Sequence, residues 1–343
     1  MKKYYFNVDR KFTVVDEPDK ILEANQVRIN MKNCGICGSD IHYYLFGENG
    51  GRKIIEPLML GHEFVGEIIE LGAKVSNFKI GDKIIVNPAL NCEKCIFCKS
   101  GKKNLCESVS FFGSAANLPH TQGAFRENIE IHESQCHNIL NSISYEEAAF
   151  AEPLAVSLHA CSFLDNYANK KILISGCGPI GLLILKILLQ SCDQTNIFVV
   201  DVNNNVLNSA KNLGIKNIIN VNNSKNFIEE FNSYFDIAFE SSGNINSINN
   251  ILATINKGGK IIQVGNMPGG NLKISYNKIM LKELKLFGSY RFYKEFEDAV
   301  NAINNKLFKF DDMLTHKFKL DNCEEAMKIA SNKDLSIKVQ VYN

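Results

Sequence analysis

A chain of 343 residues is long enough for two domains, and its hydrophobic content of 45% can fill a core in each. The formal net charge of +1, with 22% charged residues, gives no overall field that would attract a nucleic acid or an anionic membrane. The opening segment MKKYYFNVDR has no apolar signal core, so we expect a cytoplasmic protein whose eleven cysteines are metal ligands or core residues rather than disulfides.

Residues 1–150 are predicted to form a β-rich domain. Runs of β-forming residues are separated by glycine turns, for example FKIGDK (78–83). The predicted strands include QVRINMKNCG (26–35), FVGEIIELG (64–72) and DKIIVNP (82–88). This pattern favours an irregular antiparallel barrel.

Residues 151–285 predict a different architecture, in which strands alternate with helices. KILIS (171–175) precedes a glycine turn and the apolar run IGLLILKILL (180–189), which Lys186 interrupts and which is too short to span a bilayer. Such alternation predicts a doubly wound parallel sheet. Strand-and-turn texture returns after about residue 285, so residues 286–343 are expected to complete the first domain. Further strands are predicted at NIFVVD (196–201), FDIAFESSG (235–243) and KIIQVG (260–265).

The turn after KILIS carries the sequence GCGPIG, in which Gly176, Gly178 and Gly181 have the G-x-G-x-x-G spacing. Between a strand and a helix, such glycines let the backbone approach a pyrophosphate at the helix N-terminus. Asp201 lies twenty residues beyond Gly181, at the end of the next strand, where its carboxylate can bond a ribose 2′-hydroxyl. It would repel a 2′-phosphate, and the following VNNNV has no arginine, so NAD is favoured over NADP.

A cluster of four cysteines predicts a structural zinc site. Their spacing is C-x2-C-x2-C-x7-C, and four thiolates can close a tetrahedral shell with no position left for a substrate. The intervening residues are polar and basic, which suits an exposed lobe. A zinc-finger nucleic-acid module is a poor alternative because the basic charge and the recognition-helix pattern are missing. The four ligands are Cys92, Cys95, Cys98 and Cys106.

A second metal site is indicated by LGHEFVGEIIELGAKV (60–75), which matches G-H-E-x2-G-x5-G-x2-V at every fixed position. Over essentially its whole length the chain resembles the zinc-dependent medium-chain dehydrogenases. The resemblance implies a Rossmann domain inserted into a GroES-like catalytic domain, and a catalytic zinc held by Cys37 and His62. Cys34, the other cysteine of the C-x-x-C pair, is then a buried neighbour. The remaining predicted core cysteines are Cys136, Cys161, Cys177, Cys192 and Cys323.

In the polyol branch of the family two carboxylates lie at the catalytic metal ion, and they match Glu63 and Glu152. One of them ligates directly and the other binds the zinc water, and the sequence leaves both assignments open. The resemblance also implies that Ser39 bonds the reacting oxygen. His42 then stands at the outer end of a proton relay, which suits a side chain that titrates near neutrality.

Three stretches narrow the choice of substrate, because they resemble the L-idonate 5-dehydrogenases more than the sorbitol dehydrogenases. They are GICGSDIHYY, FFGSAANLPHTQGAF and GSYRFYKEF. The expected reaction is therefore hydride transfer between NAD(H) and L-idonate or 5-keto-D-gluconate. Tyr43 matches a substrate-contacting tyrosine, whereas Phe292 replaces the tyrosine of an R-Y pair. Arg291 is a candidate for the hexonate carboxylate or for the cofactor.

The alternatives are a sorbitol or xylitol dehydrogenase and, more remotely, a non-catalytic binding protein of the same fold. Relatives are commonly homodimers or homotetramers, so a homo-oligomer acting on a small molecule is expected, without nucleic-acid or membrane partners. The resemblance assigns the following residues to the cofactor: Gly176, Gly178, Pro179, Ile180, Gly181, Asp201, Val264, Gly265, Asn266, Tyr290 and Arg291.

Overall fold

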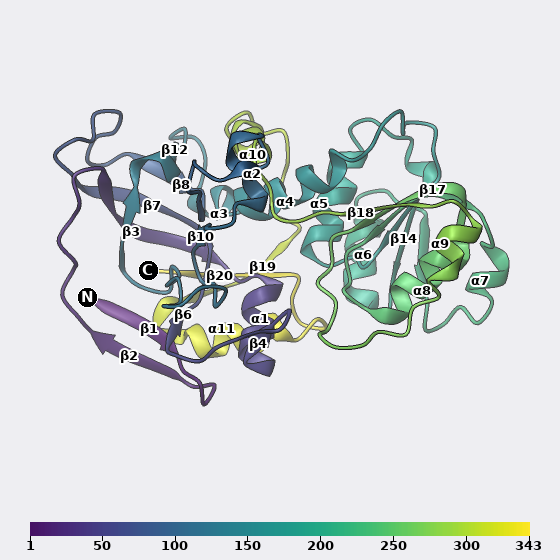
Figure 1. The fold of residues 1–343 in the computed structure, drawn as a ribbon, viewed down its shortest axis with the longest axis horizontal. Helices are drawn as coiled ribbons and strands as arrows, with labels where there is room; N and C mark the ends of the chain where they lie inside the picture. The colour runs from purple at the N-terminus through teal and green to yellow at the C-terminus, as the bar shows by residue number, and fades with distance from the viewer. The chain divides into compact units, whose positions relative to one another are not determined.

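The structure is a computed structural model that describes all 343 residues. The chain forms two compact units (Figure 1). The first comprises Met1–Glu152, Phe296–Asn332 and Lys338–Asn343, and the second comprises Pro153–Glu295 and Lys333–Ile337. None of the helices combines the length and the apolar character that crossing a lipid bilayer demands.

The first unit is built on a seven-stranded sheet in the order β12-β8-β7-β3-β20-β19, with β11 also paired to β3. The long strand β3 lies at its centre: one edge pairs with β7, while the other pairs with β11 and then with β20. All neighbours are antiparallel except β19 and β20. The strands are β3 (Gln26–Gly35), β7 (Glu63–Leu71), β8 (Lys83–Val86), β11 (Asn128–His132), β12 (Cys136–Asn138), β19 (Leu314–Lys319) and β20 (Lys338–Tyr342).

Smaller strands and several helices complete this unit. Its core is apolar and includes the fully buried Tyr4, Phe6, Phe64 and Phe125. A three-stranded sheet has the order β2-β1-β6, and β4–β5 and β9–β10 are two-stranded. These strands are β1 (Lys2–Phe6), β2 (Phe12–Asp16), β4 (Glu48–Asn49), β5 (Arg52–Lys53), β6 (Leu58–Met59), β9 (Ala89–Leu90) and β10 (Ser110–Phe111). The helical segments are α1 (Gly38–Phe46), α2 (Ile96–Lys99), η1 (Lys103–Leu105), η2 (Glu133–Gln135), α3 (Tyr145–Ala148), the start of α4 (Ala151–Cys161), α10 (Glu295–Asn304), η4 (Leu320–Asn322) and α11 (Cys323–Ser331).

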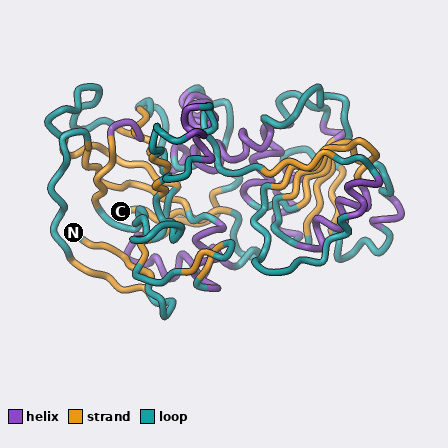
Figure 2. The backbone as a smooth tube through the Cα atoms, in the orientation of Figure 1, coloured by secondary structure: helices purple, strands orange, loops and turns teal.

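The second unit is built on a parallel sheet in the order β15-β14-β13-β16-β17-β18. Helices lie on both of its faces (Figure 2), so the predicted doubly wound sheet is confirmed. The strand order reverses between β13 and β16, where dinucleotides bind in such sheets. The elements are β13 (Ile172–Ser175), α5 (Pro179–Leu188), η3 (Gln194–Asn196), β14 (Ile197–Asp201), α6 (Asn204–Asn212), β15 (Asn217–Asn220), α7 (Phe227–Glu230), β16 (Phe235–Glu240), α8 (Ile245–Thr254), β17 (Ile255–Gln263), α9 (Asn277–Leu281) and β18 (Lys285–Gly288).

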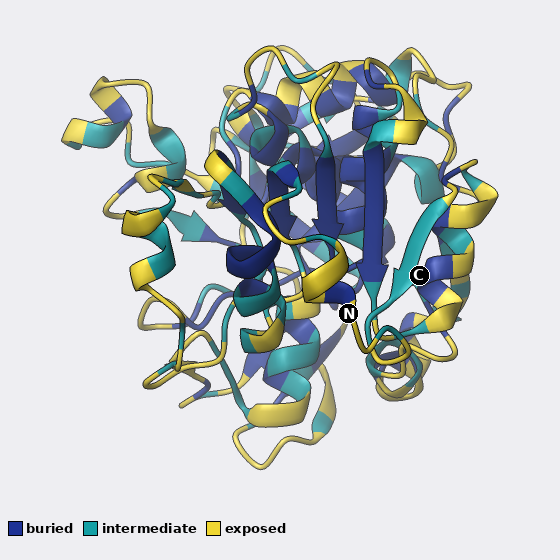
Figure 3. Cartoon of the chain, turned by 90° about the vertical axis from the view of Figure 1, so that its right-hand side faces the viewer, coloured by how far each residue is buried: buried dark blue, intermediate teal, exposed yellow.

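Burial explains why these segments fold as they do. Every residue of β13 is buried, as expected for a strand covered on both faces, and the buried strands stand out in dark blue in Figure 3. Helix α5 starts with Pro179 at its first position, where the missing N–H is harmless, and buries most of its apolar residues. The glycine loop is thereby held between two rigid buried elements.

The region after residue 285 differs from its prediction. Strand β18 pairs with β17, so the parallel sheet and the second unit extend beyond the predicted boundary at residue 285. The chain from there to the C-terminus also contains α10 and α11 in addition to strands. In α10 the buried residues Phe296, Ala299, Val300 and Ile303 recur at helical spacing, a signal that the strand-and-turn interpretation missed.

Candidate functional site

Three potential metal ligands converge in the first unit. The ligand atoms of Cys37, His62 and Glu63 all lie within 4.8 Å of one another. Strand β3 brings them together because it leads into Cys37 and pairs Gly35 with Glu63. His62 and Glu63 are buried, and Cys37 is half-buried. A thiolate, an imidazole and a carboxylate form a three-ligand set that suits zinc and leaves a coordination position open.

Asp40 fixes the segments that carry two of these ligands. This fully buried carboxylate accepts hydrogen bonds from the Cys37 N–H at 3.0 Å and from the Gly61 N–H at 3.1 Å. Its Oδ1 also lies 3.8 Å from His62 Nδ1. At this separation the two side chains are not hydrogen-bonded, so the side chain of Asp40 acts on the His62 ring through its charge. Asp40 therefore supports both Cys37 and His62.

Glu63 is held from behind by Lys338 of β20. The two side chains form an ion pair that is almost completely buried, and Lys338 Nζ also donates a hydrogen bond to the Ile36 carbonyl at 3.0 Å. Burial alone would lower the pKa of Lys338, but Glu63 and Cys37 raise it above its usual value. A side chain at position 35 would force the Glu63 carboxylate out of this place, since an added Cβ would lie 2.0 Å from Glu63 Oε2.

Glu152 lies near this group but outside it. It occupies the first turn of α4 and is buried, which raises its pKa to about 8, while His62 opposes the shift and Glu63 adds to it. Its electrostatic coupling to the ligands shows that it is close, although it does not belong to the group within 4.8 Å. Without a cation, burial likewise raises the pKa of Cys37 to about 12. A metal ion would have to displace such protons on binding.

The neighbouring residues predicted on α1 have different surroundings. The Ser39 side chain forms a hydrogen bond with Cys37, and His42 is half-buried with its ring nearly perpendicular to that of Phe46. Tyr43 is a core residue whose hydroxyl accepts a hydrogen bond from the Ala115 N–H at 3.1 Å. The structure thus gives the Tyr43 hydroxyl a partner within the protein.

Cys34 is not part of the ligand group. It is fully buried, and its Sγ would be 2.8 Å from a Cβ added to Gly61, whose φ is +89°. The thiol therefore packs against the turn that precedes His62. The cysteines predicted as core residues are buried as well: Cys136, Cys161, Cys177, Cys192 and Cys323.

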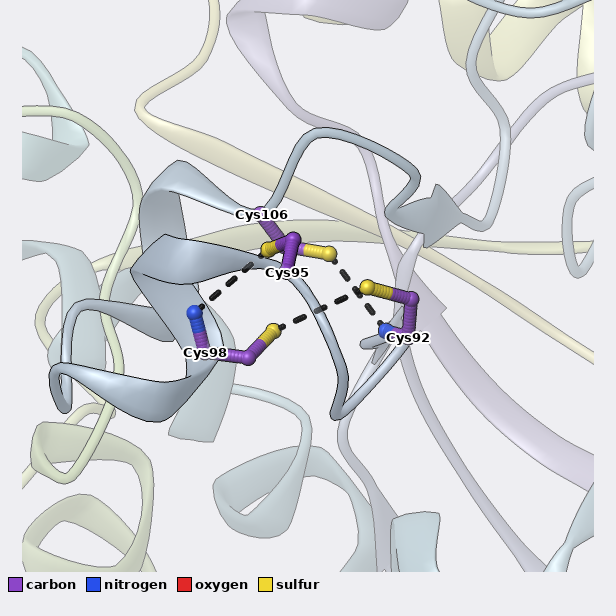
Figure 4. A group of neighbouring side chains, drawn as sticks. All are labelled: Cys92, Cys95, Cys98 and Cys106. Carbon is purple, nitrogen blue, oxygen red and sulfur yellow. Dashed lines mark hydrogen bonds between the residues drawn. The ribbon is translucent and has the colours of Figure 1, made fainter.

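The second cysteine cluster lies on the segment that contains α2 and η1 (Figure 4). All four sulfur atoms lie within 4.8 Å of one another, and the Cys92 and Cys98 sulfurs are 4.0 Å apart. Sulfurs bound to one tetrahedral zinc at about 2.3 Å would be about 3.8 Å apart. The Cys98 N–H donates to the Cys95 sulfur and is the main cause that lowers the pKa of Cys95 to about 6. The four residues therefore fit a closed thiolate site.

The glycine loop of the second unit has the features that its spacing predicts. Gly176 has φ +99°, and a Cβ there would lie 2.7 Å from the Ser242 nitrogen. A Cβ on Gly181 would lie 2.0 Å from the Gly176 oxygen. Nothing lies within 4 Å of a Cβ built on Gly178, the N-cap of α5, so its backbone is open to a ligand. Pro179 and Ile180 continue into the first turn of this helix.

Asp201 binds this loop directly. Its Oδ2 accepts a hydrogen bond from the Cys177 N–H at 2.7 Å, and its Oδ1 accepts from the Val202 and Asn203 N–H groups. The carboxylate thus stands at the carboxyl end of β14, beside the glycine loop. Its position agrees with a role at the adenosine ribose.

The remaining predicted cofactor and substrate residues lie just after β17 and β18. Val264, Gly265 and Asn266 follow β17 at the carboxyl edge of the sheet. Arg291 has φ +56°, uncommon for a residue other than glycine, and its guanidinium lies 4.9 Å from the centre of the Tyr290 ring. Phe292 is buried.

Comparison with known proteins identifies the family of both parts of the chain. Residues 23–141 match the alcohol dehydrogenase GroES-like domain, and residues 179–305 match the zinc-binding dehydrogenase domain. The L-idonate 5-dehydrogenase (NAD(P)(+)) of Escherichia coli K12 is 33% identical over 97% of this chain and 96% of its own length. The chain belongs to the zinc-dependent medium-chain dehydrogenase family.

Other members of the medium-chain dehydrogenase family match over a similar extent. The sorbitol dehydrogenase of Bacillus subtilis is 30% identical over 100% of this chain and 97% of its own length. The crystal structure of the Escherichia coli L-idonate 5-dehydrogenase superposes with a TM-score of 0.93 at 31% identity, covering 100% of this chain and 98% of the other. The predicted combination of a GroES-like and a Rossmann domain is confirmed.

The structure identifies three buried charged residues beside the candidate sites that the sequence analysis did not select. Asp40 lies inside the quoted motif GSDIHYY, so its position beside Cys37 was a usable signal. Lys338 lies far from Glu63 in the chain, within the C-terminal segment SIKVQVYN, where a buried lysine is unexpected. Glu240 ends β16 and is fully buried, and a carboxylate at the end of an apolar strand was its only sequence signal.

We predict that Lys338→Met lowers the free energy of unfolding of the metal-free protein by about 3–5 kcal/mol, because Glu63 would be left as a buried charge without its partner. The double variant Glu63→Met/Lys338→Met should recover most of the loss. Urea unfolding followed by circular dichroism measures both effects.

The matched control is Lys328→Met, which breaks the exposed ion pair with Glu324 and should change stability by less than about 1 kcal/mol. Equal stability of the Lys338→Met protein and the wild type would contradict this view of the buried pair.

Proposed function

We propose that this chain is a zinc- and NAD-dependent dehydrogenase that interconverts a secondary alcohol and its ketone, with L-idonate and 5-keto-D-gluconate as the substrate pair. The observation that carries the proposal is the convergence of Cys37, His62 and Glu63 around one point in the first unit. The glycine loop with Asp201 in the second unit supports the cofactor.

In this proposal Cys37, His62 and Glu63 ligate the catalytic zinc. Glu63 is preferred over Glu152 as the direct ligand because only Glu63 lies in the group within 4.8 Å. When bound, zinc supplies Lewis acidity toward the substrate oxygen, and NAD supplies the hydride acceptor. Glu152, whose pKa burial raises to about 8, can hold a proton beside the ligands.

The proton released by alcohol oxidation needs a route to solvent. Ser39 bonds to Cys37, next to the place where the substrate oxygen would bind. His42 lies one helical turn further along α1 and is half-buried, so its ring can exchange protons with water. We assign Ser39 to the reacting hydroxyl and His42 to the outer end of the relay.

The four-cysteine cluster is assigned to a second, structural zinc. Its sulfur separations suit a closed tetrahedral shell, which supports stability rather than chemistry. For the cofactor, Asp201 favours NAD because its carboxylate would repel a 2′-phosphate, and no arginine follows it in VNNNV. The Escherichia coli relative is named for both NAD and NADP, so the preference proposed here rests on Asp201.

The substrate assignment rests on the idonate relative and on Arg291. A guanidinium can form a two-pronged contact with a hexonate carboxylate, and the unusual backbone conformation of Arg291 suits a functional position. A neutral polyol is the second candidate, because the sorbitol dehydrogenase of Bacillus subtilis aligns over the whole chain. The edge strand β18 pairs only with β17, which supports a homodimer or homotetramer.

Zinc analysis tests the metal assignment. The wild type should bind two zinc ions per chain, while His62→Ala and Cys98→Ser should each retain one. His62→Ala should also lower turnover by about a thousandfold or more with the fold intact, because zinc contributes several kcal/mol to the transition state. Cys34→Ser is the matched control and should keep both ions. Substantial activity in metal-free protein would rule the assignment out.

A steady-state panel tests the substrate. We expect higher kcat/KM for L-idonate with NAD than for D-sorbitol, xylitol or L-threonine, and reduction of 5-keto-D-gluconate by NADH. The measurement is the change in NADH absorbance with zinc-replete enzyme. Faster oxidation of sorbitol than of idonate would replace the hexonate assignment with the neutral-polyol one, and no turnover of any alcohol would favour a binding protein.

Arg291→Gln tests carboxylate recognition. The KM for L-idonate should rise about tenfold or more, because a two-pronged charged contact is lost, while the KM for D-sorbitol should change less than about threefold. Arg291→Lys is the companion variant that keeps the charge but not the fork. An equal change for both substrates would assign Arg291 to the cofactor instead.

A further inference from the structure

Glu240 is a fully buried carboxylate at the carboxyl end of β16 that is satisfied by neutral donors alone. Its Oε1 accepts from the Ser242 N–H at 3.1 Å and from the Ser242 hydroxyl. Its Oε2 accepts from the Gly243 N–H at 3.1 Å and from Gln263 Nε2 at 2.7 Å. A buried acid with this many directed partners fixes the conformation of everything that donates to it.

One set of partners belongs to the segment after β17. The backbone carbonyl of Glu240 accepts from the Val264 and Gly265 N–H groups, both at 2.8 Å. Gln263 donates to Glu240 and also to the Gly265 carbonyl, each at 2.7 Å. A Cβ on Gly265 would lie 2.3 Å from the Gly243 nitrogen and 2.6 Å from Glu240 Oε2. Val264 and Gly265 are therefore held against Glu240, and Asn266 packs against Gly243, where an added Cβ would lie 2.4 Å from its oxygen.

The other set belongs to the turn at residues 241–243, which touches the glycine loop. The Ser241 hydroxyl donates to the Gly176 carbonyl at 2.7 Å. The Ser242 nitrogen lies so close to Gly176 that a side chain there would clash. Glu240 thus links the glycine loop on one side to residues 264–266 on the other.

The sheet topology indicates which part of the cofactor the Glu240 link would affect. In a doubly wound sheet each half binds one mononucleotide, and the halves meet where the strand order reverses, here between β13 and β16. The glycine loop follows β13 and Asp201 ends β14, whereas Glu240 ends β16 and residues 264–266 follow β17. The second half is left for the nicotinamide nucleotide.

We infer that Glu240 is a positioning residue that sets residues 264–266 relative to the glycine loop and is thereby required for binding the nicotinamide half of the cofactor. The inference rests on the proposed NAD-dependent function. Glu240→Gln keeps the size of the side chain but turns one acceptor oxygen into a donor that faces other donors. The two segments should then shift relative to one another.

The test compares NADH with ADP, which lacks the nicotinamide nucleotide, on zinc-replete protein. Glu240→Gln should raise the Kd for NADH at least tenfold and the Kd for ADP less than threefold, measured by NADH fluorescence and by calorimetry. A role in folding alone would not separate the two ligands. An equal change in both constants, or no change in either, would overturn the inference.

Two further variants keep the test decisive. Ser242→Ala removes one donor to Glu240 and one acceptor of the Asn244 N–H, and it should weaken NADH binding selectively by about threefold, so it serves where Glu240→Gln does not fold. Asp236→Asn is the matched control. Asp236 lies at the other end of β16, where its side chain accepts a hydrogen bond from the Lys171 N–H. This variant should leave both affinities unchanged. Wild-type protein that binds neither nucleotide would sink the proposed function as well, whereas a non-selective effect in the variants would sink this inference alone.

Discussion

An imbalance of buried charge in the first unit is the constraint on which the rest of the account depends. Asp40, Glu63 and Glu152 are buried there beside the half-buried Cys37, and Lys338 is the lysine that faces them. Uncompensated acids in such surroundings stay protonated, which is why burial raises the pKa of Glu152 and of Cys37. A dication at this point would restore the balance and release the protons. The net charge of these buried groups therefore suits a metal ion.

The architecture around this site follows from long-range strand pairing. Strand β3 ends two residues before Cys37, β7 starts with Glu63, and β20 contributes Lys338, so three strands from distant parts of the sequence meet in one sheet. Gly35 leaves the room that the Glu63 carboxylate occupies. In the second unit a buried carboxylate also holds separate segments together, since Glu240 fixes two loops at the carboxyl edge of the sheet. In the first unit the buried carboxylate of Asp40 accepts from backbone N–H groups beside the candidate metal ligands. In the second unit the buried carboxylate of Glu240 does the same beside the expected cofactor site.

The motifs made the fold predictable and selected the candidate ligands, because each motif is local in sequence. The glycine spacing, the alternation of strands and helices and the cysteine cluster each have a direct physical reading, and the architecture agrees with them. Lys338 and Glu240 could not be found this way, since their roles depend on contacts with residues that are distant in the chain or on an adjacent strand. The helices α10 and α11 were missed because their apolar residues were judged by strand texture rather than by helical period. The choice between Glu63 and Glu152 also needed three-dimensional distances.

In the proposed site Cys37, His62 and Glu63 surround a bound metal ion. Anomalous diffraction from crystals of the zinc-loaded protein, recorded on both sides of the zinc absorption edge, tests it most directly. The account predicts a peak about 2.3 Å from the Cys37 sulfur and about 2.0–2.2 Å from a nitrogen of His62 and an oxygen of Glu63. A zinc-loaded crystal with no peak at this position, or with a peak that Glu63 does not touch, would contradict it.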